Sequence, residues 1–324
     1  MPHLLDDPWL KPYEQAVRGR ALRALARMRD LTGGKTSLSE WASAHEYYGL
    51  HRTSRGWVFR EWAPHATAMW VVGDFSNWRN SPQYEVFRIP GTDVWERKFP
   101  ARAFKHGDNY RLEMHWDGGH GERIPAFARY VVQDPGTKLF AAQVWRPKKP
   151  YAWRNPIPPR KARPFIYEAH VGMASEECRV ATYAEFRDNI LPRIKAAGYD
   201  TVQLMAIMEH PYYGSFGYHV SSFFAASSRF GTPDELKSLV DAAHGMGLRV
   251  IMDLVHSHAV KNERDGLSRF DGTDWQYFHS GEKGWHKAWD SRCFDYGKTG
   301  VLHFLLSNCR YWLDEFHFDG YRFD

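Results

Sequence analysis

Residues 249–258 read Arg-Val-Ile-Met-Asp-Leu-Val-His-Ser-His. The segment is apolar through Val250, Ile251 and Met252, as expected for a strand that is buried on both faces of a parallel sheet. Two histidines follow where such a strand would end. Because the carboxyl ends of barrel strands surround a single pocket, we predict that functional side chains lie at the end of this segment.

The neighbouring segments alternate between strand and helix patterns. Three more strands are predicted at 165–171, 201–207 and 318–324. Helices are predicted at 182–198, 232–247 and 301–315. The first two helices open with the capping boxes Thr182/Glu185 and Thr232/Glu235. Pro192 should interrupt the first helix, because proline lacks the N–H that a helix needs.

Four strand–helix units in sequence predict a truncated barrel over residues 164–324. This would be the first half of a (β/α)8 TIM barrel, with two open sheet edges. An open doubly wound sheet stays possible from the pattern alone. No glycine-rich nucleotide fingerprint follows any of the strands, so the sequence gives that alternative little support.

The N-terminal half has a different pattern. Residues 48–145 contain short alternating apolar runs separated by Gly, Asn and Pro, which predict a β-sandwich. Residues 146–163 are Pro-rich and basic and are predicted to be a linker. Residues 1–47 form a predicted N-terminal helical segment, with an amphipathic helix at 14–29. The chain of 324 residues is therefore expected to be multidomain.

Composition argues against a disordered, membrane-spanning, nucleic-acid-binding or disulfide-rich protein. The charged fraction of 25% and hydrophobic fraction of 43% are ordinary for a globular protein. The net charge is +5, but the basic residues are scattered, so nucleic acid is not an expected partner. Three widely spaced cysteines favour free thiols. No leader or long apolar run is present, and we expect a cytoplasmic protein without membrane contact.

The segment that ends at Asp324 suggests a catalytic carboxylate. A strand places residues two apart on one face, so Arg322 and Asp324 should lie together. The cation would keep the carboxylate ionised and oriented for attack on an anomeric carbon. A structural ion pair at the strand end is the alternative. Asp253 could likewise be a solvated loop carboxylate.

The aromatic content of 16% is high and includes a cluster in Tyr-Tyr-Gly-Ser-Phe-Gly-Tyr, residues 212–218. These rings could stack on sugar faces, or they could pack as a lid on the rim of the barrel. His256 and His258 could be a metal pair, but no third ligand is evident and no metal is expected. We expect His258 to hydrogen-bond a ligand hydroxyl.

Several motifs resemble those of a known family. Asp253-x-Val255-x-Ser257-His258, followed by Gly320-Tyr-Arg-Phe-Asp324, resembles two regions of the α-amylase superfamily, glycoside hydrolase family 13. The strings at 167–173, 208–218, 223–233 and 277–281 are similar to those of 1,4-α-glucan (glycogen or starch) branching enzymes of the eukaryotic type. Those at 59–64 and 73–78 resemble carbohydrate-binding module family 48.

The resemblance implies a retaining double displacement that needs no cofactor. Asp324 would be the nucleophile that cuts an α-1,4-glucan such as glycogen, amylose or starch, and the cut chain would pass to a 6-hydroxyl as an α-1,6 branch. Arg322 would orient the nucleophile. His258 would bind the sugar in the adjacent subsite, and Tyr218 would stack on that sugar. Asp253 would shape the site, and Trp78 would stack on glucan in the binding module.

Two departures from the family pattern bear on these roles. Thr299-Gly300 stands where the family commonly has Trp-Glu, and His219 stands where it usually has Gln. The family's general acid, its third catalytic Asp and a second substrate His lie beyond the fourth strand. We therefore expect the native product to continue past Asp324 and the present chain alone to be inactive.

Two other functions remain open. A non-catalytic glucan-binding protein would use residues 48–145 beside a remnant barrel. A hydrolase or debranching relative is less well supported, because the long strings are of the branching type. The sequence does not predict an oligomeric state.

Overall fold

The computed structural model describes residues 6–324 and divides into two compact units, one that ends at Ser43 and one that spans Ala44–Asp324. The predicted segment 1–47 thus begins outside the described residues. Most of the N-terminal stretch for which no leader is expected also lies outside the described residues. Within the described part, no helix is both long and apolar enough to cross a membrane. Cys178, Cys293 and Cys309 are free.

The first unit is helical. It contains η1 Lys11–Tyr13, α2 Glu14–Thr32 and α3 Leu38–Trp41. Helix α2 ends at Gly33, whose φ of 60° is the left-handed conformation that glycine adopts readily. No residue of α2 is buried, and the side chains of Leu22 and Leu25 are 66% and 52% exposed. The predicted helix is present, and its apolar stripe is open to solvent.

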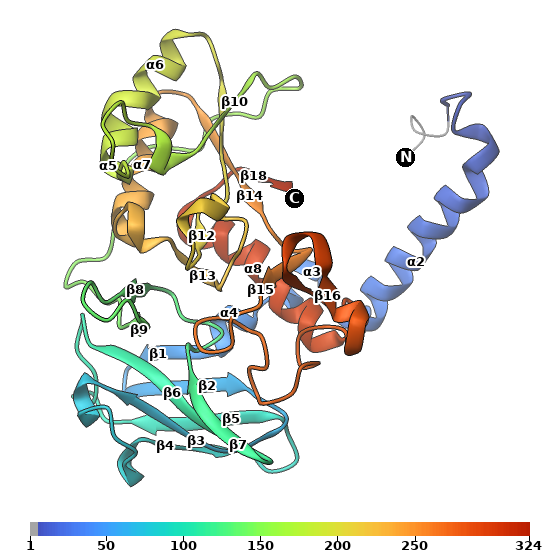
Figure 1. The fold of residues 1–324 in the computed structure, drawn as a ribbon. Helices are drawn as coiled ribbons and strands as arrows, with labels where there is room; N and C mark the ends of the chain where they lie inside the picture. The colour runs from blue at the N-terminus through green and yellow to red at the C-terminus, as the bar shows by residue number, and fades with distance from the viewer. Residues whose placement is uncertain (1–5) are drawn as a thin grey trace. The chain divides into compact units, whose positions relative to one another are not determined.

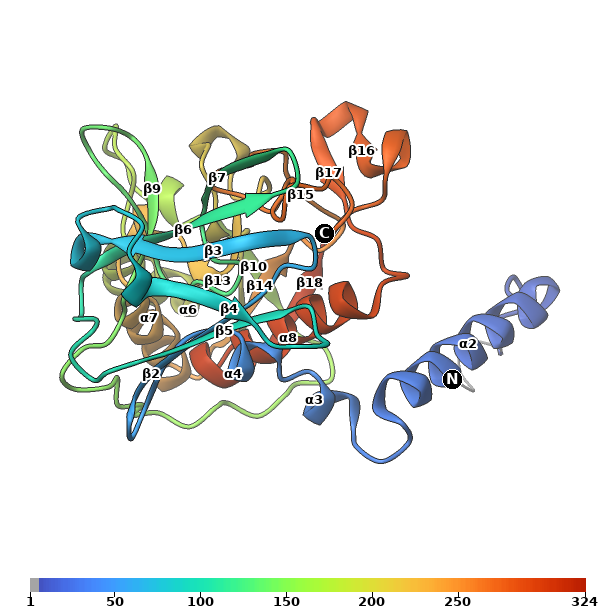
Figure 2. The same cartoon turned by 90° about the horizontal axis from the view of Figure 1, so that it is seen from below.

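The second unit begins with α4 Ala44–Tyr47 and the predicted sandwich (Figure 1). The strands are β1 Gly49–Thr53, β2 Gly56–Trp62, β3 Ala66–Gly73, β4 Glu85–Arg88, β5 Val94–Phe99, β6 Asn109–Trp116, β7 Gly119–Arg123, β8 Val131–Gln133 and β9 Phe140–Gln143. They pair in the order β1-β2-β5-β4-β3-β6-β9-β8, with β7 on β6. Figure 2 shows β3 and β6 crossing in front of the strands and helices that follow in sequence.

Residues after the linker form the predicted parallel half-barrel. Strands β10 Ile166–Ala169, β11 Thr201–Leu204, β14 Arg249–Leu254 and β18 Gly320–Phe323 lie in that order, all parallel. Val250 and Met252 are completely buried, as predicted, but Ile251 between them is only partly buried. Burial on both faces of the strand is therefore confirmed for one face only. Helices α7 Pro233–Gly245 and α8 Thr299–Phe316 follow β11 and β14 and bury their apolar faces.

The helix after β10 has the predicted interruption near Pro192. It runs as α5 Tyr183–Glu185, a π-helical stretch η5 Phe186–Ile190 and α6 Leu191–Ala196. In an α-helix the ring of Pro192 would clash with the carbonyl of residue 188, and the wider π-helical spacing relieves that clash. The interruption is therefore a change of helix type, and the chain remains helical on both sides of it.

Two connections carry small antiparallel sheets that the sequence did not predict. Strands β12 Met208–Glu209 and β13 Ser222–Ala226 pair after β11. Strands β15 His258–Val260, β16 Trp285–His286 and β17 Ser291–Cys293 pair in the order β15-β17-β16 within residues 256–298, which we call the β14–α8 connection. Short turns of 3-10 helix complete the chain: η2 Asp74–Ser76, η3 Pro82–Tyr84, η4 Val171–Met173, η6 Tyr213–Ser215, η7 Ser228–Phe230, η8 Gly281–Gly284 and η9 Lys287–Trp289.

The predicted linker has no helix or strand but is anchored. The buried carboxylate of Asp241 on α7 accepts hydrogen bonds from the Tyr151 hydroxyl at 2.9 Å and from the backbone N–H of Asn155 at 2.9 Å. The N–H of Arg154 contacts the same carboxylate at 3.1 Å. These contacts tie the linker to the half-barrel. The predicted boundaries at 48–145 and 164–324 themselves stay predictions.

The sandwich contains a buried carboxyl group that predicts a dependence of stability on pH. Glu61 is fully buried and accepts hydrogen bonds from the backbone N–H groups of Trp62 and Ala126. Burial raises its pKa from 4.5 to about 8. Between these values the folded chain holds a proton that the unfolded chain has lost, so stability falls as pH rises through this window.

Glu61→Gln should remove this fall in stability with rising pH, which amounts to roughly 2–4 kcal/mol of unfolding free energy. Melting temperatures at pH 5 and pH 8 measure it, with Glu96→Gln as the control because Glu96 is a partly exposed sandwich carboxylate paired with Arg60 at 2.6 Å. An equal pH dependence in Glu61→Gln and in the unmodified chain would contradict the prediction.

Candidate active site

Arg322 and Asp324 lie together at the carboxyl end of β18. One guanidinium nitrogen, Nη1, donates to Oδ1 of Asp324 at 2.6 Å and contacts Oδ2 of Asp253 at 3.2 Å. The backbone N–H of Asp324 donates to the carbonyl of Leu254 at 3.0 Å. The predicted same-face arrangement is therefore present, and the cation joins the ends of β18 and β14.

Asp253 is a buried carboxylate with three side-chain donors. Its Oδ1 accepts from Gln203 at 2.8 Å, and its Oδ2 accepts from the Tyr218 hydroxyl at 2.6 Å and from Arg322. It is fully buried, so the alternative of a solvated loop carboxylate is wrong. Burial raises the pKa of Asp253, although the hydrogen bond from Tyr218 and the charge of Arg322 oppose the rise.

A pocket of about 610 Å³ lies above Asp324. Asp324 follows β18, whose position near the C-terminus is marked in Figure 1. Its walls come from the loop after β12, the end of β18 and the β14–α8 connection. The lining residues include Tyr212, Tyr218, His219, His258, Trp289, Asp290, Arg322 and Asp324. Four of the predicted site residues thus line one pocket, while Asp253 lies beneath it and holds Tyr218 and Arg322 in place.

His258 is engaged on both sides of its ring. Its Nδ1 lies 2.8 Å from Oγ of Ser257, and its Nε2 lies 2.9 Å from the carbonyl of Tyr218. Burial lowers its pKa, which favours the neutral ring. To bond a ligand hydroxyl, as predicted, His258 would have to exchange one of these contacts. His256 contacts Asn308 at 2.8 Å instead, so the two histidines do not converge as a metal pair.

The aromatic loop divides between the two predicted roles. Tyr212 is 66% exposed and lines the pocket, whereas Tyr213 packs on the buried core as a lid would. Gly217 has a φ of 89°, and a Cβ there would lie 1.8 Å from the carbonyl oxygen of Ala206. Only glycine permits this approach, which brings Tyr218 over Asp253.

Sequence reasoning missed Trp289 and His286. Their rings stack at 4.1 Å with an interplanar angle of 8°, and the Trp289 ring lies 5.2 Å from that of His258. Trp289 is 52% exposed and offers the pocket a flat face. It lies in η9, in a connection whose sequence has no helix or strand periodicity. Its aromatic character was therefore the available signal. Gln203, the third donor to Asp253, was also missed.

Trp78 lies on the sandwich and lines none of the pocket above Asp324. Its indole N–H donates to Asp74 at 3.1 Å, and the guanidinium of Arg111 lies 5.1 Å from the ring centre. The side chain is 38% exposed. Its predicted glucan-stacking role stays a prediction, and Arg111 restricts such stacking to the ring face that it leaves open.

The two positions at which the sequence departs from the family pattern, His219 and Thr299-Gly300, have different surroundings. His219 lines the pocket above Asp324. A Cβ at Gly300 would lie 2.6 Å from the ring of Trp62, so that indole occupies the space which a larger residue would need.

The chain is similar to known proteins over most of its length. Residues 47–135 match the family carbohydrate-binding module 48 (isoamylase N-terminal domain), and residues 189–294 match the alpha amylase catalytic domain. Over 98% of its length the chain is 49% identical to a 1,4-alpha-glucan-branching enzyme of Yarrowia lipolytica and 44% identical to that of Dictyostelium discoideum. It covers 47% and 48% of those proteins.

The chain is related to the 1,4-alpha-glucan-branching enzymes. It spans about half the length of the curated relatives that it matches. Among solved structures, pullulanase type I from Bacillus subtilis is similar with a TM-score of 0.71 and 22% identity, over 86% of this chain and 42% of that one. Pullulanase from Bacillus acidopullulyticus gives a TM-score of 0.68, 21% identity and a cover of 86% and 38%. At these identities the two structures support the fold alone.

The hydrogen bond between Tyr218 and Asp253 gives a prediction. Tyr218→Phe removes a donor to the ionised carboxylate, so the pKa of Asp253 should rise further and stability should fall by about 1.5–3 kcal/mol. Carbon-13 NMR titration of the carboxyl groups and thermal unfolding measure the two effects. Tyr212→Phe, in the same pocket but exposed, is the control. An unchanged titration of Asp253 in Tyr218→Phe would show that the bond does not act on the carboxylate.

Proposed function

We propose that this chain is the N-terminal part of a 1,4-alpha-glucan-branching enzyme with Asp324 as its nucleophile. The observation that carries the proposal is the chain of contacts from Gln203 and Tyr218 through Asp253 and Arg322 to Asp324, at the floor of an aromatic pocket. The relatedness to proteins named as branching enzymes supports the reaction type.

Asp324 would attack the anomeric carbon of a bound α-1,4-glucan and form a glycosyl ester. Arg322 holds Oδ1 of that carboxylate at 2.6 Å and so fixes the direction of attack. A second carboxyl group would give its proton to the leaving oxygen and later accept one from the incoming 6-hydroxyl. We expect that group from sequence beyond Asp324.

The aromatic and polar groups around Asp324 suit a sugar chain. Tyr218 and Trp289 line the pocket, and the ring of His258 lies 5.2 Å from that of Trp289. A sugar hydroxyl that accepts from Nε2 of His258, or donates to it, would replace the carbonyl of Tyr218. Asp253 would not contact the substrate and would act as a positioning residue.

The donor would be an α-1,4-glucan such as glycogen, amylose or starch. We expect the protein to act in the cytoplasm, although the relative from Arabidopsis thaliana carries a chloroplastic/amyloplastic name. Nucleic acids and membranes are not expected partners. A domain division at 48–145 and 164–324, with a linker at 146–163, is part of the same proposal.

Asp324→Ala in the full-length product should abolish chain transfer and leave glucan binding largely intact. Branch formation is measured by the release of linear chains after debranching, and binding by co-sedimentation with glycogen. Asp290→Ala, at the rim of the same pocket, is the control and should retain transfer. Retained turnover in Asp324→Ala would mean that the nucleophile is another residue.

The present 324-residue chain should form no branches, because retaining transfer needs two carboxyl groups roughly 5–5.5 Å apart. Incubation with amylose followed by the iodine-stain spectrum tests this. Branching by the chain alone would overturn the assignment of the proton donor. Glycogen binding without branching, in the full-length product, would favour the non-catalytic alternative.

A further inference from the structure

A second pocket lies on the other side of the β14–α8 connection. It has a volume of about 760 Å³ and shares no lining residue with the pocket above Asp324. One wall comes from the sandwich, through His65 and the turn between β6 and β7. The other comes from residues 261–275 together with Trp285 and Arg292. The guanidinium of Arg123 on β7 donates to the carbonyl oxygens of Phe270 at 3.0 Å and Arg269 at 2.9 Å, which joins the two walls.

Three indoles line this second pocket, and each is held in place. The guanidinium of Arg123 lies 4.7 Å from the ring centre of Trp116, and that of Arg292 lies 4.6 Å from the ring centre of Trp285. Trp275 contacts His65 edge to face at 5.7 Å. Trp275 and Trp285 are nevertheless 45% and 42% exposed. Fixed, exposed rings bind a flat partner with little loss of side-chain entropy.

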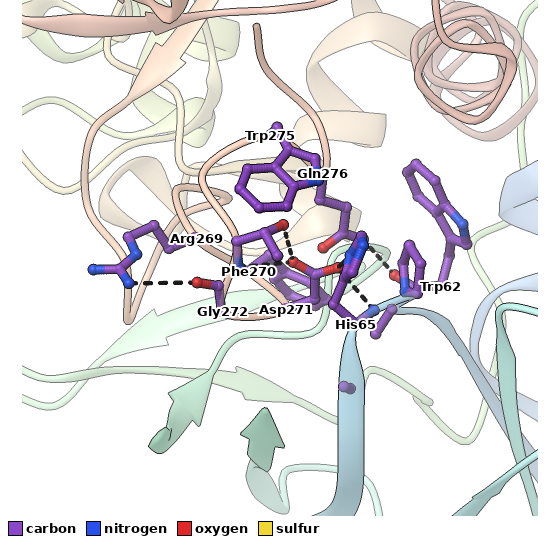
Figure 3. Close-up of polar contacts among 12 residues, drawn as sticks. Trp62, His65, Arg269, Phe270, Asp271, Gly272, Trp275 and Gln276 are labelled. Carbon is purple, nitrogen blue, oxygen red and sulfur yellow. Dashed lines mark hydrogen bonds and ion pairs between the residues drawn. The ribbon is translucent and has the colours of Figure 1, made fainter. Parts of the chain in front are cut away.

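The backbone frame of the pocket is also fixed, as Figure 3 shows. The buried carboxylate of Asp271 accepts from the backbone N–H of His65 at 3.1 Å and from the Thr273 hydroxyl at 2.6 Å. The amide of Gln276 donates to the carbonyl of Trp62 at 2.6 Å. These bonds join the sandwich to the β14–α8 connection, so the two walls of the pocket form a rigid support.

The polar groups at the rim indicate the ligand class. Carboxylates of Asp117, Glu263 and Asp274 stand beside the cations Lys261 and Arg269. Carboxylates repel a phosphate backbone, and charged groups on both sides do not favour an acyl chain. A neutral polyhydroxylated ligand can donate to the carboxylates and accept from the cations while its apolar faces lie on the indoles.

We propose that this pocket is a second α-glucan-binding site, separate from the reacting centre, with Trp275 and Trp285 as its stacking platforms. The inference rests on the proposed function for the identity of the glucan. Strand β16 carries Trp285 into this pocket, while the next residue, His286, stacks on Trp289 at the pocket above Asp324. A glucan bound in the second pocket would therefore contact the face of β16 opposite to the one that packs on Trp289.

The test uses the 324-residue chain labelled with 5-fluorotryptophan and titrated with maltoheptaose. Fluorine-19 signals are assigned by single Trp→Phe variants. The signals of Trp275 and Trp285 should shift with one shared dissociation constant. Isothermal titration should show that constant weakened by roughly two- to tenfold for each of Trp275→Ala and Trp285→Ala. Trp9→Ala, an exposed tryptophan that lines neither pocket, should leave it unchanged.

The outcomes separate this inference from the proposed function. Binding at Trp275 and Trp285 needs no turnover. This inference would therefore stand even if the full-length product formed no branches. Signals that stay fixed while other tryptophans report saturation would overturn it. So would equal affinity in the Trp275→Ala/Trp285→Ala double variant, provided its melting temperature shows a folded chain. Trp285→Phe, which keeps a ring over Arg292, should retain most of the affinity.

Discussion

The burial of Asp253 is the constraint on which the active-site geometry depends. An ionised carboxylate away from water is unfavourable unless donors surround it, and here Gln203, Tyr218 and Arg322 supply them. Each donor comes from a different element, so satisfying one carboxylate fixes a strand, a loop and a second strand together. The same guanidinium nitrogen that serves Asp253 then holds Asp324. The orientation of Asp324, the proposed nucleophile, is thus a consequence of electrostatic compensation beneath the pocket.

The sequence predicted what local periodicity encodes. The strand at 249–255, the two capping boxes and the common face of Arg322 and Asp324 all follow from spacing within a few residues, and the structure contains each of them. Contacts between distant segments carry no such signal. The bond from His258 to the carbonyl of Tyr218, and the small sheet β15-β17-β16, depend on how a long connection folds back. Family resemblance assigned roles to residues without giving these contacts.

The open edges of the parallel sheet bear on the second carboxyl group of the proposed reaction. Strand β18 pairs with β14 on one side, and the side chain of Phe323 on it is 61% exposed. Unpaired strand edges favour the addition of a further strand. A parallel strand added beside β18 would bring its own carboxyl end next to Asp324, which is where the proton donor of a retaining pair must lie. The geometry of this half therefore restricts where the second carboxyl group can be.

The β14–α8 connection links the two pockets because it is thin and internally hydrogen-bonded. Arg292 is completely buried within it, and its guanidinium donates to Ser268 Oγ at 3.1 Å and to the carbonyl of Asp274 at 2.5 Å. The same side chain supports Trp285 from below. Trp285 and His286 are adjacent strand residues on opposite faces, and His286 stacks on Trp289. Restricting the motion of Trp285 would therefore also restrict His286 and Trp289. A glucan bound at the second pocket would make the shared wall more rigid, which would favour an ordered position for the glucan that Asp324 is proposed to attack.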